Sequence, residues 1–339
     1  MKRKVSCLAL AFFIVGIALF PARLVAAPYY EGQVMTVVVG FAAGTGYDRV
    51  ARLVAKNLPN HIPGKPAIVV QNMPGAGSML AANHLYNVAK PDGLTIGIFN
   101  RSLVFAQLLK AEGVRFDMSK FSWIGSPSTE PTVLVIRADH PCKTVYDVIK
   151  TKETLYIGGQ GPITFATQMG NIDKDFLGLN IKMVQYSNSP EVYLAIERKE
   201  LDGSIDAYST ARVYIDRGLV RPILRSRVGS ATSFPRIAKV PIDEDLATDA
   251  TGKSLMALHD SLTIAGRPFV APPGTPADVA KILRDNFAKL LKDPQFRIDA
   301  EKAQVDLDYA SAEECLKVVS YVLNQPEKII KEFNKYVKF

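Results

Sequence analysis

A regular alternation of apolar, β-rich runs with segments of helical periodicity constrains the fold of this chain more than any other feature. The β-rich runs predict strands at residues 35–41, 68–71, 94–99, 122–124, 132–136, 155–157, 181–186, 204–208, 222–225 and 262–271. The periodic segments predict helices near residues 48–58, 78–89, 102–111, 275–291, 294–303, 311–324 and 326–337, and a polar stretch predicts a loop at 229–260. In the first helix, Val50, Leu53 and Val54 fall on one face. Such alternation predicts an α/β fold with mostly parallel sheets and helices on both faces.

The length of the chain predicts two lobes. After removal of the N-terminal leader described below, about 310 of the 339 residues remain, which is more than one hydrophobic core of ordinary size requires. The sequence has no internal repeat, low-complexity tract or flexible linker, so we expect chain crossings between the lobes, near residues 126–134 and 260–268. Residues 28–130 and 264–339 would then form a discontinuous first lobe, and residues 131–263 the second.

The N-terminus predicts a secretory signal peptide at residues 1–27. A basic segment at residues 2–4 precedes an apolar run at 8–20, and the small residues at 25–27 suit cleavage after Ala27. The alternative is a membrane anchor, but the apolar run is shorter than the roughly 20 residues that a spanning helix needs. No later stretch is long and apolar enough to span a bilayer, so the mature chain is expected to be soluble and periplasmic.

The charge balance argues against a nucleic-acid-binding protein. The chain carries 41 basic and 33 acidic residues, a net charge of +8, and four of the basic residues lie in the signal peptide, so the mature chain carries +4. Charges of both signs are scattered along it, without the basic stripe and interleaved aromatic residues typical of nucleic-acid binding. A weak positive field of this kind favours the approach of small anions instead.

Motifs for catalysis, cofactors and metals are missing from the sequence. It contains no Gly-x-Ser-x-Gly, His-Glu-x-x-His or Cys-x-x-Cys pattern, and its four histidines are far apart. Gly44 and Gly46 begin a dinucleotide-type pattern, but Arg49 stands in place of its third glycine, so we expect no cofactor and no metal. The spacing of Cys142 and Cys315 does not decide between a disulfide and two free thiols.

Two loops of small residues stand where strands run into helices. The first, residues 41–48, has the sequence Phe-Ala-Ala-Gly-Thr-Gly-Tyr-Asp, and the second, residues 158–164, has the sequence Gly-Gly-Gln-Gly-Pro-Ile-Thr. Small residues let the backbone approach a ligand, and the free N–H groups of a helix start attract anions. Ligands of open α/β sheets bind beyond the carboxyl ends of strands, so one such loop in each lobe predicts a cleft for an anionic ligand. Singly, each loop is a weak signal, and a tight strand–helix connection explains it as well.

Further motifs occur in a fixed order over nearly the whole mature chain. Residues 69–78, Val-Val-Gln-Asn-Met-Pro-Gly-Ala-Gly-Ser, are followed by Pro-Asp-Gly at 91–93, by Tyr and Ser-Pro within 186–190, and by Ala-Pro-Pro-Gly-Thr-Pro at 271–276. Together with the loop at 41–48, these motifs resemble those of the extracytoplasmic solute receptors of tripartite tricarboxylate transporters, the Bug receptors. That family usually has Val-x-Asn-Arg-Pro-Gly-Ala-Gly-Gly in the first segment and Phe-Ala-x-Gly-Gly-x-x-Asp in the loop.

This resemblance implies a type II periplasmic-binding-protein fold, with two lobes joined by crossing hinge strands and a ligand held between them. Ligands of the family are mostly small carboxylates, such as di- and tricarboxylic acids, amino acids and aromatic acids. The receptor would deliver its ligand to a large and a small membrane subunit. The chain departs from the family pattern at Thr45 and Tyr47 in the first loop and at Arg101 beyond the third strand. In the second loop the departures are Gln160, Pro162, Thr164 and Phe165. These departures leave the identity of the carboxylate open.

The candidate ligand-binding residues come from the two loops and from the ends of strands. They are Ala43, Gly44, Thr45, Gly46, Tyr47, Asp48, Arg101, Ser102, Gly159, Gln160, Gly161, Thr164, Asp206 and Tyr208. Arg101 is expected either to bind a ligand carboxylate in a two-bond fork or to form a salt bridge on its own lobe. Asp48 suits capping of the first helix better than ligand contact. For Asp206, orienting water or a ligand amine competes with a capping role, and Tyr47 and Phe165 flank either the ligand or the other lobe.

Two other classes of function stay open beside a transport receptor. One is a periplasmic co-receptor that signals ligand occupancy to a sensor kinase, and the other is an enzyme that uses the same cleft. The missing catalytic motifs favour a receptor over an enzyme. The sequence does not specify which membrane subunits would receive the ligand, or whether the chain forms oligomers.

Overall fold

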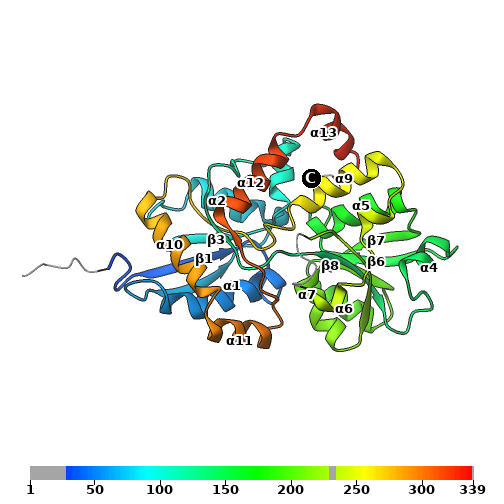
Figure 1. The fold of residues 1–339 in the computed structure, drawn as a ribbon, viewed down its shortest axis with the longest axis horizontal. Coiled ribbons are helices and arrows are strands. Elements are labelled where there is room, and N and C mark those ends of the chain that lie inside the picture. The colour runs from blue at the N-terminus through cyan, green and yellow to red at the C-terminus, as the bar shows by residue number, and fades with distance from the viewer. Residues whose placement is uncertain (1–27, 229–233, 338–339) are drawn as a thin grey trace, which may run out of the picture.

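Two α/β lobes lie side by side, each built on one central β-sheet with helices packed against it (Figure 1). The computed structural model describes residues 28–228 and 234–337. The predicted signal peptide, residues 1–27, lies outside the described residues. Within the described part, the two-lobe α/β fold predicted from the sequence is confirmed.

The first sheet has six strands in the spatial order β11–β4–β10–β3–β1–β2. Their bounds are β1 (Val34–Val39), β2 (Ala67–Asn72), β3 (Thr95–Ile98), β4 (Ser122–Ser126), β10 (Phe269–Ala271) and β11 (Ala310–Ser311). Apolar side chains of this sheet face two layers of helices, and one layer includes α1 (Gly46–Asn57), α10 (Ala277–Leu290) and α11 (Pro294–Lys302). The other layer includes α2 (Met79–Asn87), α3 (Leu103–Leu108) and α12 (Ala312–Leu323).

The second sheet has five strands in the spatial order β7–β6–β8–β5–β9. Their bounds are β5 (Thr132–Arg137), β6 (Leu155–Gly159), β7 (Ile181–Gln185), β8 (Gly203–Ala207) and β9 (Val220–Arg225). The helices α6 (Ser189–Glu197) and α7 (Tyr208–Asp216) cover one face. The other face is covered by α4 (Val145–Lys150), α5 (Phe165–Leu177), α8 (Asp243–Leu246) and α9 (Ala250–Ser261).

The strand pairing corrects one detail of the predicted fold, because both sheets are mixed rather than mostly parallel. Strands linked by a covering helix pair in parallel, as β1 does with β2 and β3, and β6 with β7 and β8. The strands next to the lobe crossings pair antiparallel, namely β10 with β3 and β4, and β5 with β8 and β9. A strand that enters from the other lobe runs against its neighbours, and a pattern of local periodicity carries no sign of this.

The chain passes between the sheets at two segments, residues 127–131 from β4 to β5 and residues 262–268 from α9 to β10. The strand predicted at 262–271 is therefore wrong over most of its length, since only Phe269–Ala271 pairs in a sheet. The loop predicted at 229–260 is wrong where α8 and α9 form. An aspartate at position 249 caps α9 by accepting a hydrogen bond from the Gly252 N–H, which is an N-terminal signal that the polar composition concealed.

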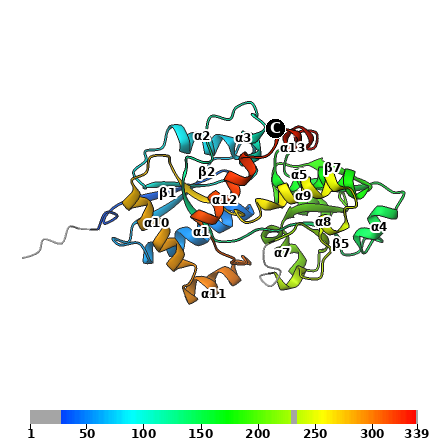
Figure 2. The ribbon, with the colours of Figure 1, turned by 45° about the horizontal axis from the view of Figure 1, so that its top comes forward.

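The C-terminal helix α13 (Glu327–Phe333) leaves the first lobe and packs on the second. Figure 2 shows α13 beside α5, and the Tyr336 ring lies 5.1 Å from the Phe176 ring of that helix. One apolar core runs through both lobes at this edge, with Phe333 4.8 Å from Phe105 of α3. Cys142 and Cys315 are not joined to each other. In the described segments, no helix has both the length and the apolar character to cross a membrane.

Candidate functional site

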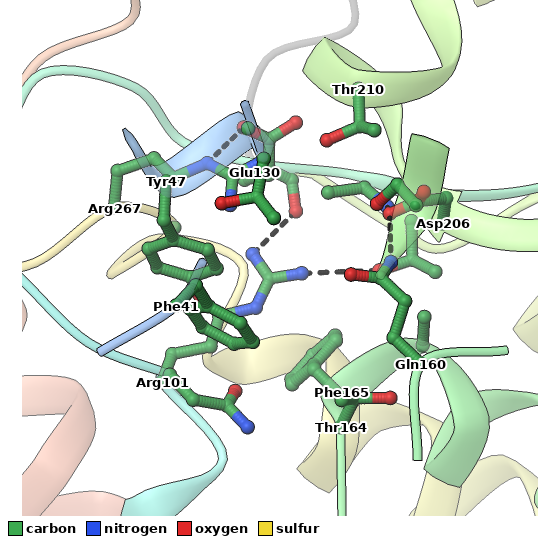
Figure 3. A pocket seen from close by; sticks show the side chains of 18 residues that line it. Phe41, Tyr47, Arg101, Glu130, Gln160, Thr164, Phe165, Asp206, Thr210 and Arg267 are labelled. Carbon is green, nitrogen blue, oxygen red and sulfur yellow. Dashed lines mark hydrogen bonds and ion pairs between the residues drawn. The ribbon is translucent and has the colours of Figure 1, made fainter. Parts of the chain in front are cut away.

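A buried cavity of about 40 Å³ lies where the two lobes meet, at the carboxyl ends of strands from both sheets (Figure 3). This volume holds about three water-sized groups, so the lobes are closed tightly on one another. The lining side chains come from both lobes and from both crossings. They are Phe41, Thr45, Gly46, Tyr47, Asn100, Arg101, Glu130, Thr132, Gln160, Thr164, Phe165, Ala166, Ser189, Asp206, Ala207, Thr210, Gly266 and Arg267.

The start of helix α1 forms one wall of the cavity. The Thr45 hydroxyl caps the helix by accepting a hydrogen bond from the Asp48 N–H. The Asp48 carboxylate is turned away from the cavity and accepts bonds from the Gly44 N–H, the Asn72 amide and Arg52. These bonds fix the loop at residues 41–48, and they lower the pKa of Asp48 against the opposing effect of burial. Asp48 thus positions the helix start.

The start of helix α5 forms the facing wall in the second lobe. The Thr164 hydroxyl accepts a hydrogen bond from the Thr167 N–H and caps the helix. The two helix starts predicted from the two loops therefore converge on one cavity, and both present the positive end of a helix dipole to it. Asn100 of the first lobe donates to the Ile163 carbonyl oxygen at 3.2 Å, which ties the two walls together.

Arg101 supplies a buried cation to the cavity. Its side chain is 3% exposed and donates to the Glu130 carbonyl oxygen at 2.6 Å and to the Thr132 hydroxyl at 3.1 Å. Both acceptors are neutral, and among the described residues no carboxylate forms an ion pair with this guanidinium. Burial lowers its pKa to about 10, so it stays protonated at neutral pH. An unpaired buried cation that faces a cavity is suited to bind an anion.

A second arginine, Arg267, lies in the other crossing and already has a carboxylate partner. Its Nε donates to Glu130 at 3.0 Å, and its Nη2 donates to the Ser209 hydroxyl at 2.7 Å. The other oxygen of Glu130 accepts the Ser209 N–H at the start of α7 at 2.7 Å. Both members of the pair are almost fully buried. The two crossings are therefore joined by an ion pair whose carboxylate also occupies a helix N-terminus.

Each of the two guanidinium groups stacks on an aromatic ring. The Arg101 guanidinium lies 3.7 Å from the centre of the Phe165 ring, which belongs to the opposite lobe. The Arg267 guanidinium lies 4.1 Å from the Tyr47 ring, and Tyr47 in turn stacks on Phe41 at 4.5 Å. Stacking of this kind holds a guanidinium in one plane and excludes water from one side of it.

Asp206 brings a carboxylate to the second-lobe side of the cavity. Its Oδ1 accepts from the Gln160 amide at 3.1 Å and from the Ala207 N–H at 2.8 Å. Burial raises its pKa to about 6, although hydrogen bonds and the nearby Arg267 act in the opposite direction. Its Oδ2 is buried and makes no hydrogen bond of acceptable geometry within the described parts of the chain, and the nearby Ser189 side chain helps to lower the pKa of this carboxyl.

The structure places half of the candidate residues on the cavity wall. Those that line it are Thr45, Gly46, Tyr47, Arg101, Gln160, Thr164 and Asp206. The others lie behind the wall or beside it, and they are Ala43, Gly44, Asp48, Ser102, Gly159, Gly161 and Tyr208. Ser102 bonds to the Asn100 side chain, the Gly161 N–H bonds to Gln185, and the Tyr208 ring packs against Phe234.

Sequence reasoning missed the charged residues of the crossings, Glu130 and Arg267. A signal for them was present, because both stand within the segments predicted as crossings, at 126–134 and 260–268. A hinge segment of a two-lobe protein borders the cleft by construction. Charged residues inside predicted crossings should therefore be counted as candidate site residues, as the residues of the two loops were.

The described residues offer no group of three or more His, Cys, Asp and Glu side chains arranged to hold a metal ion. The cavity instead combines two helix starts, an unpaired arginine, a carboxylate and stacked aromatic rings between two closed lobes. Helix starts and arginine favour an anion, and aromatic walls favour a ligand body of low polarity. Fold and site together define a two-lobed binding protein for small solutes.

The comparison with known families agrees with this class. The model of the tripartite tricarboxylate transporter family receptor matches residues 50–335, and the chain belongs to this family. The resemblance inferred from the sequence motifs is thus confirmed. The family is one of periplasmic solute-binding receptors and is not a class of enzymes.

Individual relatives are distant but cover nearly the whole chain. A UPF0065 protein of Bordetella pertussis is 25% identical over 307 residues, which make up 89% of this chain and 90% of that protein. The periplasmic binding protein BugD is similar with a TM-score of 0.71 and 21% identity, over 91% of this chain and 99% of BugD. A protein of R. palustris solved with adipate has a TM-score of 0.71 and 19% identity, over 89% and 97% of the two chains. The predicted type II fold is confirmed.

Proposed function

We propose that this protein is a periplasmic receptor that binds a small organic acid between its lobes and delivers it to the large and small membrane subunits of a tripartite tricarboxylate-type transporter. The observation that carries the proposal is Arg101, a buried guanidinium at the cavity without a carboxylate partner among the described residues. Membership of the receptor family supports a small organic acid as the class of ligand. One structural neighbour was solved with adipate, a dicarboxylate.

The closed cavity has a consequence for how the ligand enters. At about 40 Å³ it is far smaller than the roughly 300–1,000 Å³ of typical ligand sites. The lobes must therefore move apart to admit a ligand, and the crossings at 127–131 and 262–268 are where the chain would bend. Binding then selects lobe positions that fit the acid.

The ligand class is tested by a thermal-shift screen of mono-, di- and tricarboxylates, amino acids and aromatic acids, followed by titration calorimetry on the hits. A ligand of the native state at a hundredfold excess over its Kd stabilises the protein by about 2.7 kcal/mol. Stabilisation by organic acids, and not by their amides or esters, supports the proposal. No stabilisation by any acid in the screen contradicts it.

The alternatives of a signalling receptor and an enzyme are tested on the same ligand. Capture of the membrane subunits by the ligand-loaded protein supports transport, whereas capture of a sensor kinase supports signalling. Ligand recovered unchanged after prolonged incubation excludes turnover of that ligand.

A further inference from the structure

A buried arginine and a buried aspartate line the cavity from opposite lobes, and each lacks an interaction partner. Arg101 of the first lobe donates to two neutral acceptors and forms no ion pair with a described carboxylate. Asp206 of the second lobe has one oxygen, Oδ2, that no described donor satisfies. Figure 3 shows both side chains directed toward the same space between Phe165 and Thr210.

The unbonded Oδ2 oxygen of Asp206 is expected to accept a hydrogen bond from the ligand. Asp206 is 4% exposed, and a buried carboxylate oxygen without a donor is destabilised because it has lost its water contacts. The neighbouring cations do not supply the missing bond. Arg267 is held by Glu130 and the Ser209 hydroxyl. Arg49 of α1 donates from Nη2 to the Ser209 carbonyl oxygen, and its buried Nε makes no hydrogen bond to Asp206 or to any other described residue.

We propose that the ligand carries an ammonium group close to its carboxylate, so that the ammonium binds Asp206 Oδ2 while the carboxylate binds Arg101. This inference rests on the proposed function and narrows it to an amine-bearing organic acid. An ammonium group fits better than a hydroxyl because it both donates hydrogen bonds and balances the buried charge of the carboxylate. The Gln160 amide, which already donates to Oδ1, holds the carboxylate in the required orientation.

Calorimetry on matched acids tests this inference. Each set shares one carbon skeleton and differs only at the carbon next to the carboxylate, which carries hydrogen, hydroxyl or ammonium. The skeletons are acetate, propionate, succinate, glutarate and 3-phenylpropionate. In the sets that bind, the ammonium member is expected to bind about tenfold more tightly or better than the unsubstituted acid, as a charged hydrogen bond warrants.

Asp206→Asn is expected to abolish this preference, because the amide keeps the shape of the side chain without its charge. Asp202→Asn is the matched control, since Asp202 immediately precedes β8, at the end opposite to Asp206, and accepts a hydrogen bond from the Tyr156 N–H. The preference should survive in the control. Equal binding of all members of a set to the wild type overturns the inference and leaves the receptor function standing, whereas binding of no acid removes both.

Measuring the affinity of the wild type as a function of pH tests the inference without the Asp206→Asn variant. The charged and titratable groups that face Asp206 are Arg49, Arg267, Tyr193 and Tyr214. Burial raises the pKa of both tyrosines and lowers that of Arg49, whereas Glu130 raises the pKa of Arg267 against the effect of burial. Below pH 6, where Asp206 becomes protonated, affinity for the ammonium member should fall. Affinity for the unsubstituted acid should fall less over the same range, because it depends only on the weakening of the Arg212–Asp306 ion pair, whose carboxyl has a pKa raised by burial to about 6. Parallel pH profiles for the two ligands contradict the inference.

Discussion

At the scale of single residues, Arg101 is the side chain on which recognition depends most. Its guanidinium is buried, stacked on Phe165 and bonded only to neutral groups in the described structure. We expect Arg101→Ala to weaken binding of the acid by about 2–3 kcal/mol, or roughly thirty- to a hundredfold, because the carboxylate loses a charged hydrogen bond in a dry site. Arg101→Lys should recover little of this, since lysine lacks the planar fork. Calorimetry measures both.

A matched control for Arg101 is Arg284→Lys, which changes an arginine of the same lobe that donates to the Trp123 carbonyl oxygen away from the cavity. Its affinity for the acid should equal that of the wild type. If Arg101→Lys and Arg284→Lys bind equally well and melt at the same temperature, Arg101 has no part in recognition.

The sequence predicted only part of the candidate site. The residues that it missed differ in a physical way from those that it predicted. The two loops and Arg101 were found because helix starts and strand ends have local patterns. Glu130 and Arg267 were not, because their importance comes from the pairing of two segments 137 residues apart in the chain. No local pattern records a contact of that kind.

At the scale of elements, the start of α1 fits against α7 of the other lobe with no space for a side chain. A Cβ at Gly46 would overlap the Thr210 hydroxyl and lie 2.9 Å from Arg267 Nη2. We expect Gly46→Ala to weaken binding roughly tenfold or more, because overpacking costs about 1–3 kcal/mol and here falls on the closed form. Calorimetry on Gly46→Ala and on Gly46→Ala/Thr210→Ala measures this. The double variant should regain part of the affinity, because the contact with Arg267 Nη2 remains, and equal losses in both variants would contradict the steric explanation.

Three buried aspartates, one each from α5, α8 and α9, should make the stability of the protein depend on pH. Asp173, Asp243 and Asp260 are each at most 5% exposed, and no described donor reaches either oxygen of Asp173. Burial raises all three pKa values, that of Asp260 to about 7, and repulsion from Asp260 adds to the rise at Asp173 and Asp243. The folded state therefore holds protons that the unfolded state has released. The free energy of unfolding should fall as the pH rises from about 4 to about 7.

The test is urea denaturation across this pH range for the wild type, Asp173→Asn and the control Asp175→Asn. Asp173→Asn removes one of the mutually repelling carboxylates, so its stability should change less with pH. Asp175 is exposed on the same helix, and its variant should follow the wild type. An unchanged slope in Asp173→Asn would show that the cluster does not control stability.

The prediction of elements succeeded where the local pattern was strong and failed at the crossings. Helix α1 was predicted because Val50, Leu53 and Val54 define a face, and these residues are buried in the structure. Helix α9 was missed because its first turn is polar and glycine-containing and because it packs between α5 and α12. Segment 262–268 was predicted as a strand because it is apolar, yet it is buried as a crossing with no strand to pair with in the described sheets.

At the scale of the whole molecule, the closed form is held by contacts on both edges of the cleft. On one edge, α13 packs against α5. On the other, Arg212 of α7 donates to Glu301 of α11 at 2.7 Å and to Asp306 at 2.9 Å. Ligand entry requires both edges to separate. The apparent affinity therefore includes the equilibrium between open and closed lobes, in addition to the contacts with the ligand.

Arg212→Gln should shift this equilibrium toward the open form, because it removes two ion pairs that exist only when the lobes are closed. In small-angle scattering, we expect the wild type to become more compact on saturation with the acid. The variant without ligand should have a larger radius of gyration than the wild type, and it should bind roughly tenfold more weakly because a smaller fraction of molecules is closed. The control is Arg217→Gln, which breaks the ion pair with Glu197 inside the second lobe and should match the wild type. If ligand compacts neither the wild type nor Arg212→Gln, the lobes do not close by hinge bending, and entry must occur by local movement of the cavity walls.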